Sequence, residues 1–401
     1  MSRFAPSWWI RVLGLALPGA MLWLLTSAAG AAPSTLQLHG FATQGVVSTN
    51  RNEFFGPSSE TPSFQFTEIG VNASLRPRPS TLIAAQLISR RAGGERRDAQ
   101  PRIDYALLDQ QMQAGLHGRW GVRVGRAKNP FGLYNETRDV AFTRPGILLP
   151  QSIYFDRTRS LALSSDGVAT YADWNLPSGD LILHLGVGRP QTGEDVEWAT
   201  LGRPEPGEFK GETSIIGQVK YEHDGGRVIA ALSAANTRAH FDSAEEGPGD
   251  ADFRFQPWIL SLQYNAEHWQ VTAEYARRAL SLSGLDIPQR DFDITGESAF
   301  LQYTHRLSPE WTWRLRHDVL YTDRDDRAGT RFAASTGLPA HTRFAKDWTT
   351  GLEWRPHPQV MLAVEYHRVD GTAWLPGQDN PDPRETSRHW DMWLGQVSVR
   401  F

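Results

Sequence analysis

The feature that most constrains the fold is a pattern that recurs along most of the chain: segments of about ten residues in which apolar and polar side chains alternate. The last segment, HWDMWLGQVSVRF, shows it clearly. Trp393, Val397 and Phe401 fall on one face of this segment, whereas Gln396 and Ser398 fall on the other. Alternation with a period of two is typical of a β-strand with different surroundings on its two faces.

The same pattern recurs in three further segments, TSIIGQVKYEH, HWQVTAEYA and EWTWRLRHDVLYTD. In the third of these, the expected apolar face carries Trp311, Trp313, Leu315, Val319 and Tyr321. The expected polar face carries Thr312, Arg314, Arg316 and Asp318. We therefore expect strands with one apolar and one polar face throughout the chain.

The connections between these segments fall into two classes that take turns along the chain. The short ones are 76–80, 117–118, 177–179, 224–226, 266–267, 308–310 and 357–358. The long, polar ones are 48–62, 91–101, 129–164, 190–212, 241–252, 283–296, 326–346 and 371–388. Seven short turns and eight long loops predict sixteen strands.

An even number of antiparallel strands, with short turns at one end and long loops at the other, is typical of an outer-membrane β-barrel. We expect tilted strands of about 9 to 11 residues and two girdles of aromatic residues. The expected girdle residues are Trp120, Trp174, Trp258, Trp269, Trp311, Trp354 and Trp390. The chain has no cysteine, so hydrogen bonds and packing must stabilise it without disulfides.

The N-terminal residues have the features of a secretory signal peptide. Two arginines flank the start of an apolar run over 12–25, and small residues follow it. The run is shorter than the roughly 20 residues that a membrane-spanning helix requires, and Ala29-Gly30-Ala31 fits a cleavage site. We therefore predict a cleaved signal peptide at 1–32 and a single barrel domain at 33–401.

Composition and motifs exclude several classes of function. The formal charge of −4 argues against a nucleic-acid partner, which would require a concentrated basic face. No G-x-S-x-G or H-E-x-x-H motif occurs, so we predict no catalytic residues, no cofactor and no enzyme activity. The acidic segments 242–250 and 323–326 lack EF-hand spacing, and we assign no metal.

The segment 129–164 differs from every other connection. It is the longest irregular segment, and its apolar residues follow neither a helical nor a strand period. A barrel of sixteen strands leaves an aqueous channel, so we expect this third loop to fold inward and pack on the inner wall. The expected anchors are Phe131, Leu133, Tyr134, Phe142, Ile147, Leu148, Leu149, Ile153, Tyr154 and Phe155.

Basic side chains accompany this segment and predict a channel constriction. The candidates are Lys128, Arg138, Arg144, Arg157 and Arg159. Clustered arginines favour anions at close quarters. The alternative is that they only pair with Glu136, Asp139 and Asp156 to fix the loop, because buried charges are normally paired.

A second basic feature lies on an expected strand. Arg314 and Arg316 are two residues apart on the same expected inner face, which suggests a basic track along the lumen. Pairing with Asp318, or with acids on neighbouring strands, is an equally good interpretation.

The stretch GVRVGRAKNPFGLYNETRD, followed by FTRPGILLPQSIYFDRTR, resembles bacterial outer-membrane porins, and in particular the phosphate-selective porin O and P family. The resemblance implies a sixteen-stranded barrel, usually trimeric, whose third loop narrows the channel. It also implies that Asn129, Pro130, Phe131 and Gly132 anchor that loop, and that Phe401 is the signal for barrel assembly. Phosphate specificity is not carried over, because Lys128 is the lone lysine near the expected constriction.

The sequence therefore predicts a porin in the outer membrane of a Gram-negative bacterium, acting as a passive channel for small hydrophilic solutes with a preference for anions. The expected partners are outer-membrane lipids, two further copies in a homotrimer, the barrel assembly machinery and small solutes. Two alternatives remain open at this point. They are an export channel for an anionic polysaccharide and an outer-membrane barrel hydrolase.

Overall fold

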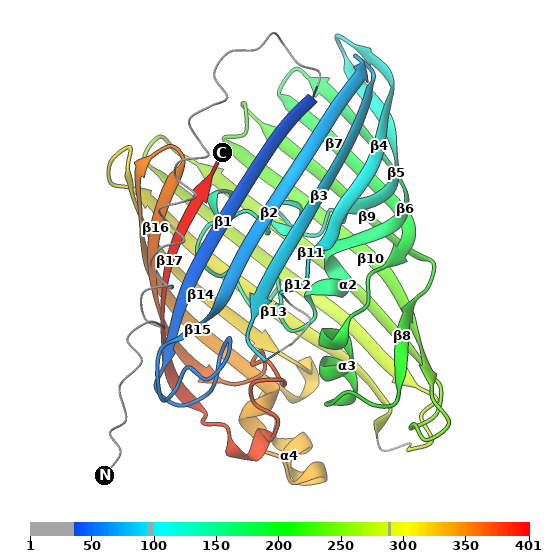
Figure 1. Ribbon diagram of the computed structural model, residues 1–401, viewed down its shortest axis with the longest axis vertical. Coiled ribbons are helices and arrows are strands. Elements are labelled where there is room, and N and C mark those ends of the chain that lie inside the picture. The colour runs from blue at the N-terminus through cyan, green and yellow to red at the C-terminus, as the bar shows by residue number, and fades with distance from the viewer. Residues whose placement is uncertain (1–35, 95–98, 288–289) are drawn as a thin grey trace, which may run out of the picture.

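The computed structural model describes residues 36–94, 99–287 and 290–401, and these residues form a closed antiparallel β-barrel (Figure 1). The strands are β1 (Leu36–Thr49), β2 (Ser63–Arg78), β3 (Thr81–Ala92), β4 (Arg102–Gly115), β5 (Gly118–Lys128), β6 (Ser164–Leu176), β7 (Gly179–Pro190), β8 (Gly207–Gly211), β9 (Ser214–His223), β10 (Val228–Ser243), β11 (Ala251–Asn265), β12 (Trp269–Ser283), β13 (Phe292–Arg306), β14 (Trp311–Tyr321), β15 (Phe344–His357), β16 (Val360–Gly371) and β17 (His389–Arg400). The expected signal peptide, 1–32, lies outside the described residues.

Short helices occur in the connections. They are η3 (Asn135–Thr137), η4 (Ala141–Thr143), α2 (Arg159–Leu163), α3 (Glu194–Leu201), η6 (Arg324–Asp326), α4 (Thr330–Thr336), η7 (Ala340–Arg343) and η8 (Pro383–Glu385). Within the described ranges, no helix has both the length and the apolar character needed to cross a membrane.

The barrel closes between its first and last strands. β1 pairs antiparallel with β17, from Phe41 opposite Arg400 to Thr49 opposite Met392. β8 and β9 occupy one position in the wall, because both pair with β10 and only two residues separate them. The described residues therefore form sixteen wall positions, and the predicted sixteen-stranded antiparallel barrel is confirmed.

The strands are longer than expected. Apart from β8, those in the described ranges contain 10 to 16 residues, whereas the sequence suggested about 9 to 11. The apolar band of an outer-membrane barrel is about 25 Å tall, and the ladders of hydrogen bonds continue beyond it. The long connections, with α3 and α4, lie at one end of the barrel, which we call the long-loop end (Figure 1).

The two faces of the wall have the chemistry that the alternation predicts. On β14, Trp311 and Leu315 are exposed on the outside, whereas Arg314, Arg316 and Asp318 are buried inside. Exposed large apolar side chains recur on most strands, and many buried strand residues are polar. This arrangement is inverted relative to a water-soluble protein and suits a wall with lipid outside and water inside.

One expected girdle residue was assigned to the wrong face. Trp390 is 2% exposed and packs inside against Trp374 of the last loop, with ring centroids 5.2 Å apart. Its neighbour Trp393, which is 57% exposed, lies on the outer face instead. The two positions differ by three residues, so they point to opposite faces of β17. The other six expected girdle tryptophans are exposed on the outside.

Candidate channel constriction and vestibule

The third long connection, 129–163, runs from β5 to β6 inside the barrel and is called loop 3 below. Its groups form hydrogen bonds or ion pairs with inner-face side chains on strands around the wall. Those side chains are Ser233 of β10, Glu274 and Arg278 of β12, Arg316 of β14, Glu365 of β16, Gln396 of β17, Glu68 of β2 and Arg90 of β3. The predicted inward fold of the third loop is confirmed.

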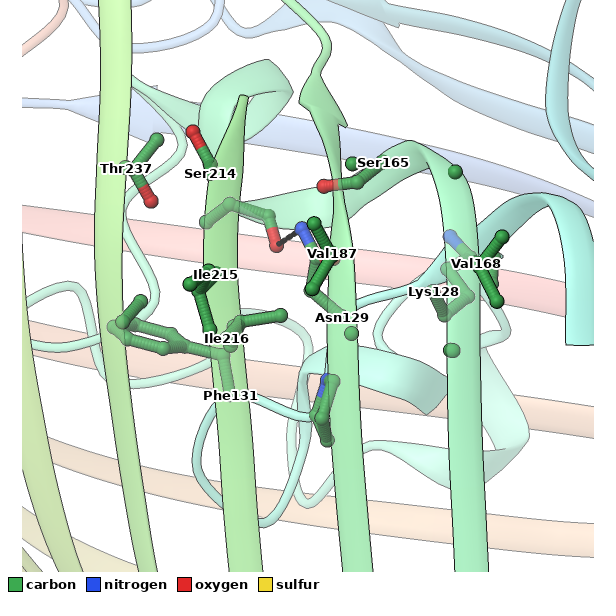
Figure 2. Close-up of a pocket in the computed structure, with 18 of the residues that line it drawn as sticks. Lys128, Asn129, Phe131, Ser165, Val168, Val187, Ser214, Ile215, Ile216 and Thr237 are labelled. Carbon is green, nitrogen blue, oxygen red and sulfur yellow. Dashed lines mark hydrogen bonds between the residues drawn. The ribbon is translucent and has the colours of Figure 1, made fainter. Parts of the chain in front are cut away.

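The loop begins at the segment Asn129 to Gly132. The Asn129 amide N–H donates to the Leu163 carbonyl at 3.1 Å, which joins the two ends of the loop. A hollow of about 40 Å³ is lined by residues of this segment and of β6, β7 and β9. Figure 2 shows Phe131 beside Ile216 at this hollow, and Asn129 near Val187.

Gly132 makes the first sharp turn. Its φ of +64° lies in the left-handed region, which favours glycine. A Cβ at this position would lie 2.2 Å from the Tyr154 hydroxyl oxygen. Its N–H donates to Ser233 Oγ at 3.1 Å, and its carbonyl accepts from Gln218 Nε2 at 2.9 Å. Glycine therefore allows the backbone to lie directly against the wall.

The apolar residues of loop 3 pack in separate places around the lumen. Phe131, Leu149, Ile153 and Tyr154 pack with Ile259, Ala276 and Phe300 of the wall. Ile147 and Leu148 join a cluster that includes Val47 and Trp374, and Phe142 packs on Met361. Among the ten expected anchors, Leu133, Tyr134 and Phe155 are half-buried and the other seven are buried.

Two wall carboxylates bind the backbone of the loop directly. Glu365 accepts hydrogen bonds from the N–H groups of Ile147 at 2.8 Å and Leu148 at 3.2 Å. Glu274 accepts from the Leu133 N–H at 2.9 Å and from the Tyr154 hydroxyl at 2.7 Å. These carboxylates stabilise irregular backbone in the interior, where an unpaired polar group would be costly.

Arg144, one of the predicted constriction residues, is buried and binds the wall. Its guanidinium donates to both oxygens of Glu68 and to Gln396 Oε1. Arg90 of β3 lies between two acids: its Nε is 3.2 Å from Glu68 Oε1, and its Nη2 is 2.9 Å from Asp156 Oδ1 of loop 3. Arg138 is also buried and donates to the carbonyls of Tyr154 and Phe155. Arg144 thus fixes the loop to the wall, and Arg138 fixes the loop to itself.

Lys128 and Arg159 share a carboxylate partner. Both form ion pairs with Asp139, and Lys128 also pairs with Asp104 at 2.5 Å. Burial acts to raise the pKa of Asp139, but the two cations hold that pKa well below its usual range. In the same way, Arg90, Arg138 and Arg159 overcome burial and lower the pKa of Asp156 to about 2. Both acids are therefore ionised at neutral pH, and they neutralise their basic neighbours.

Arg157 differs from the other four predicted constriction residues. It is half-buried, donates to the Ala373 carbonyl at 2.5 Å, and has no carboxylate within ion-pair distance among the described residues. Burial lowers the pKa of its guanidinium to about 10, and the nearby charge of Arg343 adds to this effect. The guanidinium is still protonated at neutral pH, and it has N–H groups that remain available for an anion.

The arginines of the expected basic track lie beneath loop 3. Arg314 pairs with Glu353 at 2.7 Å and with Glu365 at 3.5 Å. Arg316 donates to the Leu148 carbonyl at 3.0 Å and to Thr349 Oγ1 at 3.1 Å. Both side chains are buried. Their contacts hold the loop and the wall together.

A hollow of about 220 Å³ lies between loop 3 and the connections at the long-loop end, and we call it the vestibule. It is lined by parts of loop 3, the wall, the connection that carries α3 and the last loop. Its arginines are Arg90, Arg102, Arg126, Arg157 and Arg159, and its acids are Asp104, Asp156 and Asp195. Basic groups outnumber acidic groups in the lining of the vestibule.

On the other side of loop 3, charged groups of both signs lie on the inner wall. Arg123 pairs with Asp109 at 3.1 Å and lies 4.8 Å from the centroid of the Tyr171 ring. Glu136, which was expected to pair with loop arginines, is exposed and forms no ion pair within the described ranges.

The sequence did not identify the wall partners of the loop. Glu68, Arg90 and Glu365 lie on strands far from loop 3 in the chain. A signal was present at Glu274, which falls on the expected polar face of its strand. An acid on such a face binds solute, an inserted loop or a basic side chain of a neighbouring strand.

The fold is a closed sixteen-stranded antiparallel barrel, and it resembles the barrels of outer-membrane porins and channels of known structure. The channel DcaP of Acinetobacter baumannii superposes with a TM-score of 0.57 at 12% identity, covering 94% of this chain and 99% of that chain. OmpF of Salmonella typhi, in complex with daunomycin, gives 0.57 at 11% identity, covering 91% and 97%. OmpT of Vibrio cholerae, an outer-membrane protein, gives 0.56 at 10% identity, covering 94% and 100%.

These likenesses are in the fold. The sequence matches no family model, and it matches none of the curated proteins.

Proposed function

We propose that this protein is an outer-membrane channel through which small hydrophilic solutes diffuse, with a preference for anions. The observation that carries the proposal is Arg157, which lines the vestibule and has no carboxylate partner among the described residues. Three other arginines of the lining, Arg90, Arg126 and Arg159, are paired with acids. Fixed positive charge at a narrow entrance raises the local concentration of anions and lowers that of cations.

The attachment of loop 3 supports small solutes rather than polymers. Loop 3 bonds to strands around the wall, including β2, β10, β12 and β16. Solutes therefore have to pass beside a segment that is held at many points. This arrangement argues against the export of a polysaccharide, and nothing in the described residues favours a hydrolase over a channel.

The roles of the predicted site residues follow from their contacts. Lys128, Arg138, Arg144 and Arg159 set the shape of the constriction through ion pairs and hydrogen bonds, while Arg157 contacts solute. The segment Asn129 to Gly132 anchors the loop, and Phe401 carries the assembly signal. The same proposal includes a homotrimer in the outer membrane of a Gram-negative bacterium. It also includes kinship with the phosphate-selective porin O and P family.

The test is the reversal potential of single channels in a planar bilayer under a gradient of potassium chloride. We expect a potential of the sign given by chloride permeation, reduced in magnitude by Arg157→Gln. Arg331→Gln is the matched control, because Arg331 is an exposed arginine of the loop before β15 whose guanidinium Nη2 lies 3.9 Å from Asp323 Oδ2. Cation selectivity in the unmodified protein would overturn the proposed preference.

Phosphate specificity, which the sequence does not carry over, has its own measurement. Phosphate added at millimolar concentration should block chloride conductance no more strongly than sulfate does. Sulfate provides the control, because it is a similar oxyanion.

A further inference from the structure

A second hollow, of about 170 Å³, lies beside the vestibule at the long-loop end. It is lined by residues from four connections: loop 3, the connection with α3, the one with η7 and the last loop. Arg157 and Gln378 line both hollows. A solute that enters here therefore reaches the same arginine that faces the vestibule.

The chemistry of this hollow is more selective than that of the vestibule. Among the residues that the structure describes, Arg157 is the one charged residue in its lining, and no carboxylate lines it. Trp198, Leu375 and the prolines at 381 and 383 provide apolar surface, and Thr342 and Gln378 provide polar groups. One positive charge beside an aromatic ring suits an anion that also has an apolar body.

The two principal side chains, Trp198 and Arg157, are both held by the last loop. Trp198 is on α3 (Glu194–Leu201), and its indole lies against Gly377 of the last loop, where a Cβ would come within 3.0 Å of the ring. Arg157 is positioned by its hydrogen bond to the Ala373 carbonyl, which uses one of its five N–H donors. The side-chain amide of Gln378 has no hydrogen-bond partner in the described ranges.

The charge of Arg157 is not neutralised locally. Arg343 of η7 is close enough to lower the pKa of Arg157, so the neighbouring charge on this side is also positive. A bound anion would relieve this repulsion and would satisfy the remaining N–H groups. A carboxylate matches the planar guanidinium with two parallel hydrogen bonds.

We infer that this hollow captures small organic monocarboxylates with a planar apolar body before they pass to the channel. The carboxylate binds Arg157 and the amide of Gln378, and the ring of the ligand packs on Trp198 and Leu375. The volume is suitable, since an engineered cavity of roughly 150 Å³ binds benzene. Only the passage of the ligand to the channel rests on the proposed function, because binding in the hollow requires no conduction.

The experiment is calorimetric titration of the full-length protein in detergent with three probes: benzoate, acetate and benzyl alcohol. Benzoate has both the charge and the ring, whereas each of the others lacks one of them. We expect benzoate to bind about threefold to tenfold more tightly than acetate, which lacks the aromatic contact. Benzoate should bind about tenfold more tightly than benzyl alcohol, or better, because the alcohol lacks the charge-assisted hydrogen bonds. Equal binding of benzoate and acetate would overturn the inference.

Variants assign the binding to this hollow. Arg157→Gln should weaken benzoate binding about tenfold or more, and Trp198→Ala about threefold to tenfold, with recovery in Trp198→Phe. Arg203→Gln is the control, because Arg203 is an exposed arginine of the same connection as Trp198 and pairs with Glu205 at 2.8 Å. Equal affinities in Arg157→Gln and Arg203→Gln would overturn the inference.

Folding and transport are separated from capture. Each variant is first checked for the shift in gel mobility on heating that a folded barrel shows. Trp198 lies in a connection at the long-loop end, so its variants should fold even if Arg157→Gln does not. An anion-selective channel that binds no benzoate contradicts the capture site and leaves the proposed function intact. If the unmodified protein binds benzoate but does not conduct, and Trp198→Ala abolishes that binding, the result contradicts the proposed function and leaves the capture site intact.

Discussion

Arg144 of loop 3 and Glu68 of β2 form a buried ion pair with two hydrogen bonds, in which Nη1 lies 3.1 Å from Oε1 and Nη2 lies 2.7 Å from Oε2. The two residues are 76 positions apart in the sequence. Arg90 also binds this carboxylate. Glu68 is thus the point at which the loop and two neighbouring wall strands are joined.

Removing this carboxylate should loosen the constriction. Glu68→Gln leaves the buried Arg144 without its acid and leaves Arg90 with Asp156 alone, and breaking a buried pair in this way costs about 3 to 5 kcal/mol. We expect a lower free energy of unfolding in denaturant titrations in detergent, together with larger or noisier single-channel conductance. Asp173→Asn is the control, since it breaks the more exposed pair with Arg119 and should cost less than about 1 kcal/mol. Equal losses in the two variants would show that Glu68 has no special structural role.

The turn at Gly132 gives a prediction about loop position. Gly132→Ala combines backbone strain at φ +64° with a Cβ that would lie 2.2 Å from the Tyr154 hydroxyl oxygen. Gly337→Ala is closely matched, with φ +71° but open space around the new methyl group. We expect Gly337→Ala to lower the unfolding free energy by about 1 kcal/mol, and Gly132→Ala to lower it further and to change the conductance. Identical conductance in both variants would argue that loop 3 does not depend on this contact.

Asp156 predicts how the stability of the loop depends on pH. Because its pKa in the folded protein is about 2, below the ordinary value of 3.8, its ion pairs stabilise the folded state above about pH 4. This contribution is lost as the pH falls towards 2, and a shift of this size corresponds to about 2 kcal/mol. The measurement is the difference in unfolding free energy between the unmodified protein and Asp156→Asn at several pH values. The difference should be constant from pH 7 to 5 and should shrink below about pH 4; a difference that is the same at pH 7 and pH 2 would contradict the assignment.

The C-terminal residue closes the barrel and provides a test of assembly. The Phe401 N–H donates to the Gly40 carbonyl at 3.0 Å, and the Gly40 N–H donates to the Phe401 carbonyl at 3.1 Å. The Phe401 ring lies over Gly40, where a Cβ would come within 2.4 Å of it. We expect Phe401→Ala to reduce the amount of heat-modifiable barrel in isolated outer membranes severalfold, and Val399→Ala to have little effect. Normal amounts of folded Phe401→Ala would show that assembly does not require this ring.

Some features could be predicted because they depend on local periodicity. A β-strand places alternate side chains on opposite faces, so the alternation of Trp311, Leu315, Arg314 and Arg316 was sufficient to assign the inner and outer faces of β14. The alternation of short turns and long connections gave the number of strands. Trp390 was placed in the girdle because it lies near a strand end. It is an odd number of residues from Trp393, however, so it points to the other face of β17.

Other features depended on contacts between distant segments. The sequence of loop 3 indicated that it is apolar, basic and irregular, and hence that it packs inside, but it did not indicate which wall residues it meets. Ion pairs such as Arg144 with Glu68 form between strands and loops that only the closed barrel brings together. The same is true of Arg157, which differs from its neighbours because, among the residues that the structure describes, a carbonyl of the last loop lies beside it and no carboxylate does.

The architecture thus follows from local properties of the chain, namely the period of two and the order of short turns and long connections, which together are typical of an outer-membrane barrel. The tertiary structure alone decided which cations are neutralised and which one faces the hollows at the long-loop end. The physical reason is that charge pairing depends on distances of a few ångströms between residues that are far apart in the sequence.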